Sequence, residues 1–232
     1  LEPKSAEELG AVRMKLLQAG YRSRDAVRLY YLAQMVLGLG LLAAGLSYYL
    51  IVIDGPDSTM QQKLMYIILP GAIGYLAPKY WITKRVEERK KQIEEGFPDA
   101  LDMMLVCVEA GQSLDQSIVR VSKEIRASYA ALADEFEIIS HEMKAGKDKA
   151  SVLNDMGERC GVADVSSFVT VLNQASTFGT SIADALRIYA SEMRDKSVMR
   201  AEEKANKLPT KMTLTTMMLT VPPLLIILVG PS

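Results

Sequence analysis

Three long apolar segments dominate the pattern of hydrophobic and polar positions along the chain. They cover residues 30–53, 64–82 and 212–230. Each is close to the ~20 residues that a helix, rising ~1.5 Å per residue, needs to cross the hydrocarbon core of a bilayer. The pattern therefore predicts about three transmembrane helices, with a short external turn at residues 54–63 joining the first two.

The long charged stretch at residues 83–211 has a helical pattern of its own. Its apolar residues recur every three or four positions, as in the stripe Leu132, Phe136, Ile139 and Met143, and no stretch alternates like a strand. Glycines separate the stripes. One helix is predicted to end at Gly96, with Pro98 in the first turn of the next. We therefore expect an all-α fold in which this stretch forms a helical bundle.

An internal repeat runs through this bundle. Residues 111–126 align without a gap with residues 179–194, 68 positions later, and the full repeat covers residues 97–126 and 165–194. Each copy has a helix-ending glycine followed two residues later by a serine that can cap the next helix. These residues are Gly111 and Ser113 in the first copy, and Gly179 and Ser181 in the second. The pattern indicates a duplicated helical hairpin, although any capped amphipathic helix after a glycine shares part of it.

Basic residues gather beside the apolar segments and predict the orientation. Residues 1–29 carry several arginines around an amphipathic pattern, and the charged stretch is basic at both of its ends, whereas the connector at residues 54–63 has only Lys63. Because basic residues favour the cytoplasmic side, we expect the N-terminal segment and the large loop in the cytoplasm and the connector outside.

Composition removes some classes of function. The 27 Lys and Arg are balanced by 28 Asp and Glu, giving a net charge of −1 over 232 residues. A nucleic-acid-binding protein needs a concentrated basic face, so no nucleic-acid partner is expected. Cys107 and Cys160 belong to no metal-binding or redox motif, and a cytoplasmic setting favours reduced, buried thiols.

The motifs of common enzymes are missing from the sequence. Gly146-Lys147-Asp148 lacks the glycine and hydroxyl residue of a phosphate-binding loop, and the single histidine, His141, lacks the second histidine of a zinc-protease helix. The carboxylates on the same helix are interpreted as a solvated face: Asp134, Glu135, Glu137 and Glu142. We therefore expect no catalytic residue, no cofactor and no metal site.

Several runs of sequence resemble a known family. They are FPDALDMMLVCVEAGQSLDQSI, HEMKAG, VADVSSFVTVLNQASTFGTSIADALR and RAEEKANKLPTKM before a terminal apolar span. Together they resemble the inner-membrane platform proteins of tight-adherence (Tad) pili, of the TadC kind, which are similar to the F-type platform proteins of type II secretion. Family members often have an additional span upstream, so the resemblance leaves the total number of spans open.

The resemblance implies a non-enzymatic scaffold in the bacterial inner membrane, with its large loop in the cytoplasm. The implied partners are a cytoplasmic hexameric secretion ATPase, a second, TadB-like platform protein, pilin subunits and membrane lipids, in a homo- or hetero-oligomer. Such a scaffold couples the ATPase to the insertion of pilins into a growing filament.

One segment is a candidate for passing motion from the bundle to the membrane. It joins the bundle to the last span and contains Arg200, Glu202, Glu203, Lys204, Leu208 and Pro209. A solvated helix with a basic end at the lipid headgroups is the simpler interpretation. The alternative function is a membrane transporter or channel subunit, which the proline-containing spans allow but which the lack of deeply placed Asp, Glu, Lys or Arg within the spans disfavours.

Overall fold

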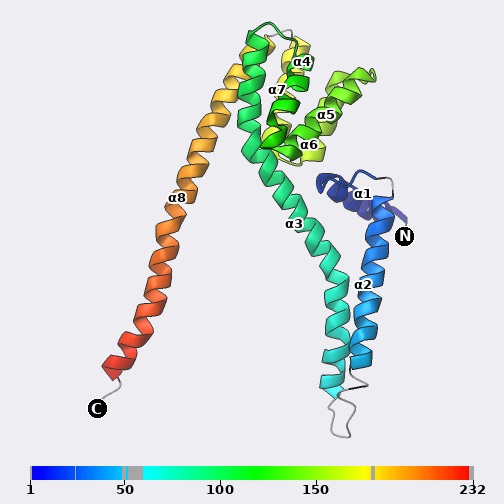
Figure 1. Ribbon diagram of the computed structural model, residues 1–232, viewed down its shortest axis with the longest axis vertical. Coiled ribbons are helices and arrows are strands. Elements are labelled where there is room, and N and C mark those ends of the chain that lie inside the picture. Colours follow the sequence, from blue (N-terminus) through cyan, green and yellow to red (C-terminus); the bar gives the residue numbers. More distant parts are fainter. Residues whose placement is uncertain (1, 24, 49–50, 52–59, 179–180, 230–232) are drawn as a thin grey trace. The chain divides into compact units, whose positions relative to one another are not determined.

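A computed structural model describes residues 2–23, 25–48, 51, 60–178 and 181–229 (Figure 1). Side chains are described for fewer residues, with gaps at 2–8, 60–67 and 177–178 and across much of residues 204–229. The described residues are helical and contain no strand, which confirms the all-α expectation. Contacts divide the chain into two compact units, one of residues 1–97 and 118–170 and the other of residues 98–117 and 171–232.

The first half of the chain forms three helices. They are α1 (Glu2–Gln18), α2 (Ala26–Tyr48) and α3 (Met60–Glu109). The helix α3 has 50 residues and continues through Gly96 and Pro98. The prediction that a helix ends at Gly96 is therefore wrong. A Cβ at Gly96 would lie only 2.4 Å from Cγ of Tyr129, so this glycine allows an aromatic ring to pack directly on the helix backbone.

The second half continues with shorter helices before a second long one. They are α4 (Leu114–Glu124), the 3-10 helix η2 (Ile125–Ala127), α5 (Ala130–Lys144), α6 (Lys149–Cys160), α7 (Ala163–Phe178) and the 48-residue α8 (Ile182–Val229). Gly111 separates α3 from α4 at a φ of 86°, a backbone conformation that glycine adopts without the steric cost of a Cβ.

The first unit has a core built from four helices. Ile93 and Phe97 of α3, Phe136 of α5, Met156 of α6 and Phe168 of α7 are almost fully buried. The rings of Phe97 and Phe168 meet edge to face with their centroids 5.4 Å apart, an arrangement that aromatic pairs favour. The apolar stripes seen in the sequence therefore form this core.

The second unit joins the end of α3 to α8. Leu101 and Met104 of α3 and Leu186 of α8 are at most 1% exposed. Two ion pairs connect the same helices, with Arg187 Nη2 lying 2.6 Å from Glu109 Oε1 and Arg194 Nη2 lying 2.8 Å from Asp102 Oδ1. This part of α8 is thus fixed both by burial and by charge.

Burial follows the 68-residue repeat of the sequence. Eight pairs of matching positions are buried in both copies, and they lie both before the glycine and after it. The pairs are Phe97 and Val165, Ala100 and Phe168, Leu101 and Val169, Met104 and Leu172, Ile118 and Leu186, Val121 and Tyr189, Ser122 and Ala190, and Ile125 and Met193. A duplicated hairpin remains a prediction, and this agreement supports it.

Candidate functional site

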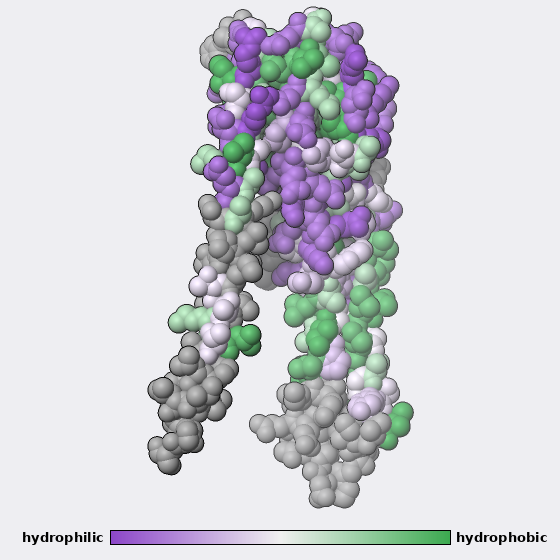
Figure 2. Space-filling model, turned by 60° about the vertical axis from the view of Figure 1, so that its left-hand side comes forward, coloured by the Kyte–Doolittle hydropathy of each residue, from purple (hydrophilic) through white to green (hydrophobic). Residues whose placement is uncertain are grey.

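The helix α2 exposes an apolar surface that would be costly in water. Leu32, Met35 and Val36 are 58%, 63% and 67% exposed, and hydrophobic residues gather on the described parts of α2 and α3 (Figure 2). Among the residues that were described, α2 is the one helix long and apolar enough to cross a membrane. It corresponds to the first of the three expected spans, residues 30–53.

The apolar helix α2 packs closely on the first half of α3. A Cβ at Gly74 would lie 2.6 Å from the carbonyl oxygen of Leu37, and a Cβ at Gly71 would touch the Leu42 side chain at 3.3 Å. Gln34, which is buried, donates from Nε2 to the carbonyl oxygen of Tyr75 at 3.3 Å. Small residues and a satisfied polar group at such a contact are typical of helices that associate in a membrane.

The other two expected spans lie within longer helices. Residues 64–82 form part of α3, and the side chains described there include the exposed Ile68, Leu69 and Ile73. Residues 212–229 form the end of α8, where Met217, Met218 and Leu219 are exposed and the side chains from Val221 onward lie outside the described ones. The connector at residues 54–63 lies mostly outside the described residues.

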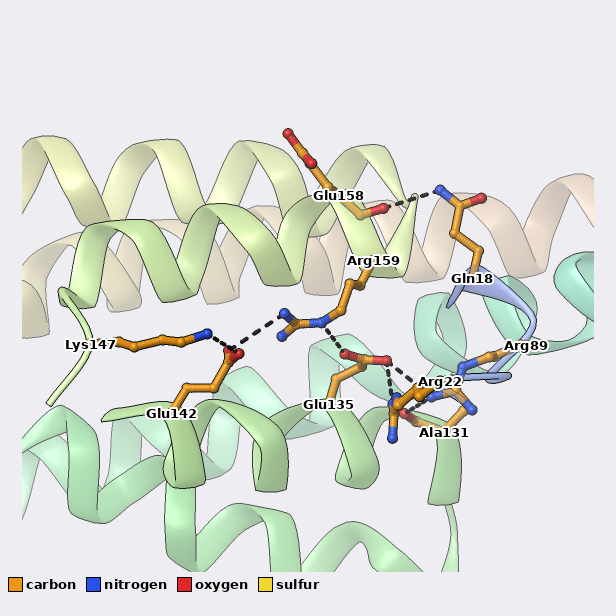
Figure 3. Close-up of polar contacts among 9 residues, drawn as sticks. All are labelled: Gln18, Arg22, Arg89, Ala131, Glu135, Glu142, Lys147, Glu158 and Arg159. Carbon is orange, nitrogen blue, oxygen red and sulfur yellow. Dashed lines mark hydrogen bonds and ion pairs between the residues drawn. The ribbon is translucent and has the colours of Figure 1, made fainter. Parts of the chain in front are cut away.

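A buried carboxylate connects several helices of the first unit. Glu135 on α5 is 0% exposed, and three arginines point at it (Figure 3). Arg22, between α1 and α2, donates to its Oε1 at 2.8 Å, Arg89 of α3 donates to the same oxygen at 3.1 Å, and Arg159 of α6 donates to Oε2 at 3.0 Å. We call these four residues the Glu135 cluster.

Further polar contacts extend the Glu135 cluster along α5 and α6. Arg159 also lies 3.5 Å from Glu142, to which Lys147 donates at 2.7 Å. At the other side, Gln18 at the end of α1 donates to the carbonyl oxygen of Glu158 at 3.1 Å (Figure 3). The N-terminal segment is therefore attached to the bundle by Gln18 at the end of α1 and by Arg22, which follows α1 and binds the buried Glu135.

The electrostatics of the Glu135 cluster keep its carboxylate ionised. Burial disfavours the charge, but the hydrogen bond from Arg159 and the charges of Arg22 and Arg159 outweigh it, so the pKa of Glu135 falls below its ordinary value. Burial, together with the charge of Glu135, raises the pKa of the neighbouring Cys160 thiol to about 12. A carboxylate that stays charged and a thiol that stays neutral are poor acids, bases and nucleophiles at neutral pH. The cluster is therefore suited to holding helices together.

The expectation that all four carboxylates of α5 face solvent is thus wrong for Glu135. It is right for Glu137, which is 53% exposed and pairs with Arg126. Glu135 lies three residues after Leu132 and one before Phe136, within the apolar stripe of α5. That position is the sequence signal of its burial, and a basic partner could have been expected from it.

Of the residues expected at the hairpin turns, the two serines lie at helix starts and Gly111 follows a helix end. Ser113 Oγ accepts from the backbone N–H of Gln116 at 3.3 Å at the start of α4, and Ser181 Oγ accepts from the backbone N–H of Asp184 at 3.4 Å at the start of α8. Gly111 lies at the end of α3 with its positive φ. Gly179 lies outside the described residues.

The candidate force-coupling residues all lie in the middle of α8. The helix runs through them without interruption, Pro209 included. Glu202 and Glu203 are exposed and Arg200 is half-buried, whereas the side chains of Lys204, Leu208 and Pro209 lie outside the described ones. These residues and the Glu135 cluster belong to different units of the chain.

Potential metal ligands do not gather among the described residues. No group of three or more His, Cys, Asp or Glu is arranged there to hold a metal ion. His141, 72% exposed, has Glu137 as a charged neighbour at 3.9 Å.

Comparison with known proteins gives one match. The model of the family described as type II secretion system (T2SS), protein F, matches residues 100–230. No curated protein and no solved structure matches the chain. Because the matched region covers more than half of its length, the chain belongs to the type II secretion system protein F family.

Proposed function

We propose that this chain is the inner-membrane platform protein of a Tad-type pilus, where it couples a cytoplasmic secretion ATPase to pilin insertion. Members of its family are non-enzymatic platform proteins of secretion and pilus machines in the inner membrane. They work with secretion ATPases and other platform proteins. The family match at residues 100–230 is the observation that carries the proposal. The runs of sequence shared with the TadC kind favour the Tad branch.

The proposed topology has three spans, of which α2 is the best supported. The other two are the apolar first part of α3 and the end of α8. The basic residues that follow Ile82 and precede Met212 favour a cytoplasmic location for the intervening bundle, where an ATPase could reach it. A second platform protein, pilins and further copies of the chain would contact the remaining surfaces.

The proposed path of motion is α8. This helix is fixed to the end of α3 by Arg187 and Arg194 and continues to the apolar segment at its C-terminal end. A continuous helix moves as a stiff unit, so displacement of its cytoplasmic part would reach the membrane through the segment around Glu202 and Glu203. This gives the segment its proposed role in force coupling.

The first experiment tests whether the bundle binds the secretion ATPase. The full-length chain, tagged, is purified in mild detergent from cells that contain a Tad pilus system, beside a variant lacking residues 97–206 that is present in the membrane at the same level. We expect the secretion ATPase to co-purify with the full chain and not with the deletion variant. If the ATPase never co-purifies, and pili still assemble when the gene is deleted, the proposed function is wrong and the transporter interpretation is to be tested next.

The second experiment tests the path of motion with a matched pair of variants. E202G/E203G and E202A/E203A remove the same two carboxylates, but each glycine costs a helix about 1 kcal/mol relative to alanine. Both variants should capture the ATPase as the wild type does. Pilus assembly, counted by electron microscopy, should fall strongly in the glycine variant and stay near the wild-type level in the alanine variant. Equal assembly by the two variants would rule out a coupling role that depends on helix stiffness.

A further inference from the structure

We propose that the junction of α1, α2 and α3 binds one anionic phospholipid of the bilayer, with an acyl chain in an apolar cavity and the phosphate on Lys15 and Lys79. The proposal rests on the membrane placement in the proposed function. All residues involved belong to the first unit of the chain.

The apolar half of this site is a cavity of about 350 Å³. It lies against the first two turns of α2 and the part of α3 around Trp81, and its wall includes Leu16, Ala26, Leu29, Pro78 and Trp81. The volume is within the usual range for ligand sites, ~300 to 1,000 Å³, and the lining is the kind that holds a hydrocarbon chain.

The polar half is a smaller cavity of about 60 Å³ that adjoins the first. The two share Leu16, Tyr30 and Ile82 in their walls, and the smaller one adds the side chains of Lys15 and Lys79. Both lysines are exposed, so their ammonium groups can reach a ligand. An apolar cavity beside one lined by two cations matches a molecule that joins a hydrocarbon chain to a phosphate.

The charges around the two cavities favour an anion. Asp25 is the carboxylate in their walls, and it lies 75% exposed and 3.5 Å from Arg28, which offsets its charge. On the other side, the guanidinium of Arg85 lies over the ring of Tyr21, 5.3 Å from its centre. Lysines and an arginine therefore outnumber the single, paired carboxylate.

The position along the helices fits the boundary between headgroups and acyl chains. The helix α2 begins at Ala26, so its first two turns are the cytoplasmic end of the proposed span. Tyr21, Tyr30 and Trp81 gather there, with the rings of Tyr21 and Trp81 6.4 Å apart. Tyrosine and tryptophan are enriched at this depth because their rings have both an apolar body and a polar group. A bilayer lipid is thus the occupant already present at the site.

The test uses Trp81, which is the only tryptophan of the chain, as a reporter. The full chain is placed in nanodiscs of zwitterionic phosphatidylcholine that contain a small fraction of lipid with brominated acyl chains, which quench tryptophan on contact. The brominated lipid is either phosphatidylglycerol, which is anionic, or phosphatidylcholine. We expect brominated phosphatidylglycerol to quench Trp81 at a lower fraction and to saturate, and brominated phosphatidylcholine to quench only in proportion to its amount.

A matched pair of variants separates the cavity from general charge attraction. K15Q/K79Q should reduce the preference for phosphatidylglycerol roughly tenfold or more. K91Q/K144Q removes the same charge from exposed lysines outside both cavities and should leave the preference unchanged. A33F, which fills the apolar cavity at an exposed lining position, should weaken quenching by phosphatidylglycerol in a chain whose lysines are intact.

Two other outcomes would overturn the proposal, and they differ in meaning. Equal quenching by the two brominated lipids would show a membrane-inserted chain without this site and would leave the proposed function standing. No quenching by either would show that Trp81 does not lie in a bilayer, and the proposed membrane placement would fail with it.

Discussion

At the scale of single residues, Glu135 carries a charge where water is excluded, and its partners come from three other parts of the chain. Removing one member of a buried ion pair is costly because the remaining charge loses its compensation. The α1–α2 junction, α3 and α6 all depend on this one carboxylate through Arg22, Arg89 and Arg159.

Replacing Glu135 by glutamine tests this dependence. We expect E135Q to lower the free energy of unfolding by about 3 kcal/mol, since three guanidinium groups would lose their counter-charge. The exposed pair of Glu137 and Arg126 provides the control, and E137Q should cost less than about 1 kcal/mol. Thermal unfolding of the full chain in detergent, followed by circular dichroism, measures both. Similar melting temperatures for the two variants would show that the cluster contributes little.

Acid should weaken the same cluster. The pKa of Glu135 is lowered in the folded chain from an ordinary value of 4.5, so the unfolded chain takes up a proton first as the pH falls. Its contribution to stability is therefore fully present above about pH 4.5 and is lost as the pH falls from there through the lower, folded-state pKa. Thermal unfolding measured from pH 7 to pH 3 should show a steeper decline for the wild type than for E135Q. Parallel declines would assign acid sensitivity to other carboxylates.

The two cysteines should differ in reactivity. Cys160 is 1% exposed and burial raises the pKa of its thiol to about 12, whereas Cys107 is half-buried on α3. At pH 8 a thiol reagent should modify Cys107 quickly and Cys160 only after unfolding, as mass spectrometry of the modified peptides can measure. C107S should abolish the fast reaction. Rapid modification of Cys160 in the folded chain would contradict its burial.

At the scale of helices, Gly96 shows why a sequence signal can mislead. A glycine with a proline two residues later usually marks the end of one helix and the start of another, but α3 continues through both. The residue that explains Gly96, Tyr129, is 33 positions away in the sequence and packs on its backbone. Local patterns do not contain such a contact, so the role of this glycine could not be read from its neighbours.

A methyl group at Gly96 should therefore separate these elements. We expect G96A to destabilise the bundle by about 1–3 kcal/mol, the cost typical of forcing extra atoms into a packed site, because the near atoms of Tyr129 belong to the base of its ring. The control is G10A in α1, where a Cβ would meet nothing within 4 Å and where alanine should favour the helix by up to about 1 kcal/mol. Circular dichroism melts compare the two. A G96A chain as stable as the wild type would show that Tyr129 moves aside at little cost.

Another element could be predicted closely. The stripe from Leu132 to Met143 lies within α5, because helical spacing and a terminating glycine agree there. The burial of Glu135 was not predicted because two local signals disagree there. Its charge suggested exposure to solvent, whereas its place in the apolar stripe indicated the core. Its arginine partners are 24 to 113 positions away, beyond the reach of any local pattern.

At the scale of the whole molecule, the three-span topology can be tested with reporter fusions. Alkaline phosphatase joined after Ser58 should be active, because that connector is proposed to face the outside, and joined after Gly146 it should be inactive. Green fluorescent protein at the same two points should give the reverse pattern. Phosphatase activity at Gly146 would place the bundle outside the cytoplasm, and the proposed contact with a cytoplasmic ATPase would then be impossible.

The unbroken course of α3 also couples the rotation of the proposed span to that of the bundle. Each residue turns a helix by about 100°, so one residue inserted after Thr83 would rotate the face of Val86, Ile93 and Phe97 away from its core while leaving the preceding span as it is. Seven inserted residues would restore the phase to within about 20° and raise the bundle by about 10 Å. A series of insertions of different lengths would thus separate the effect of rotating the bundle from the effect of raising it. It would show which of the two pilus assembly requires.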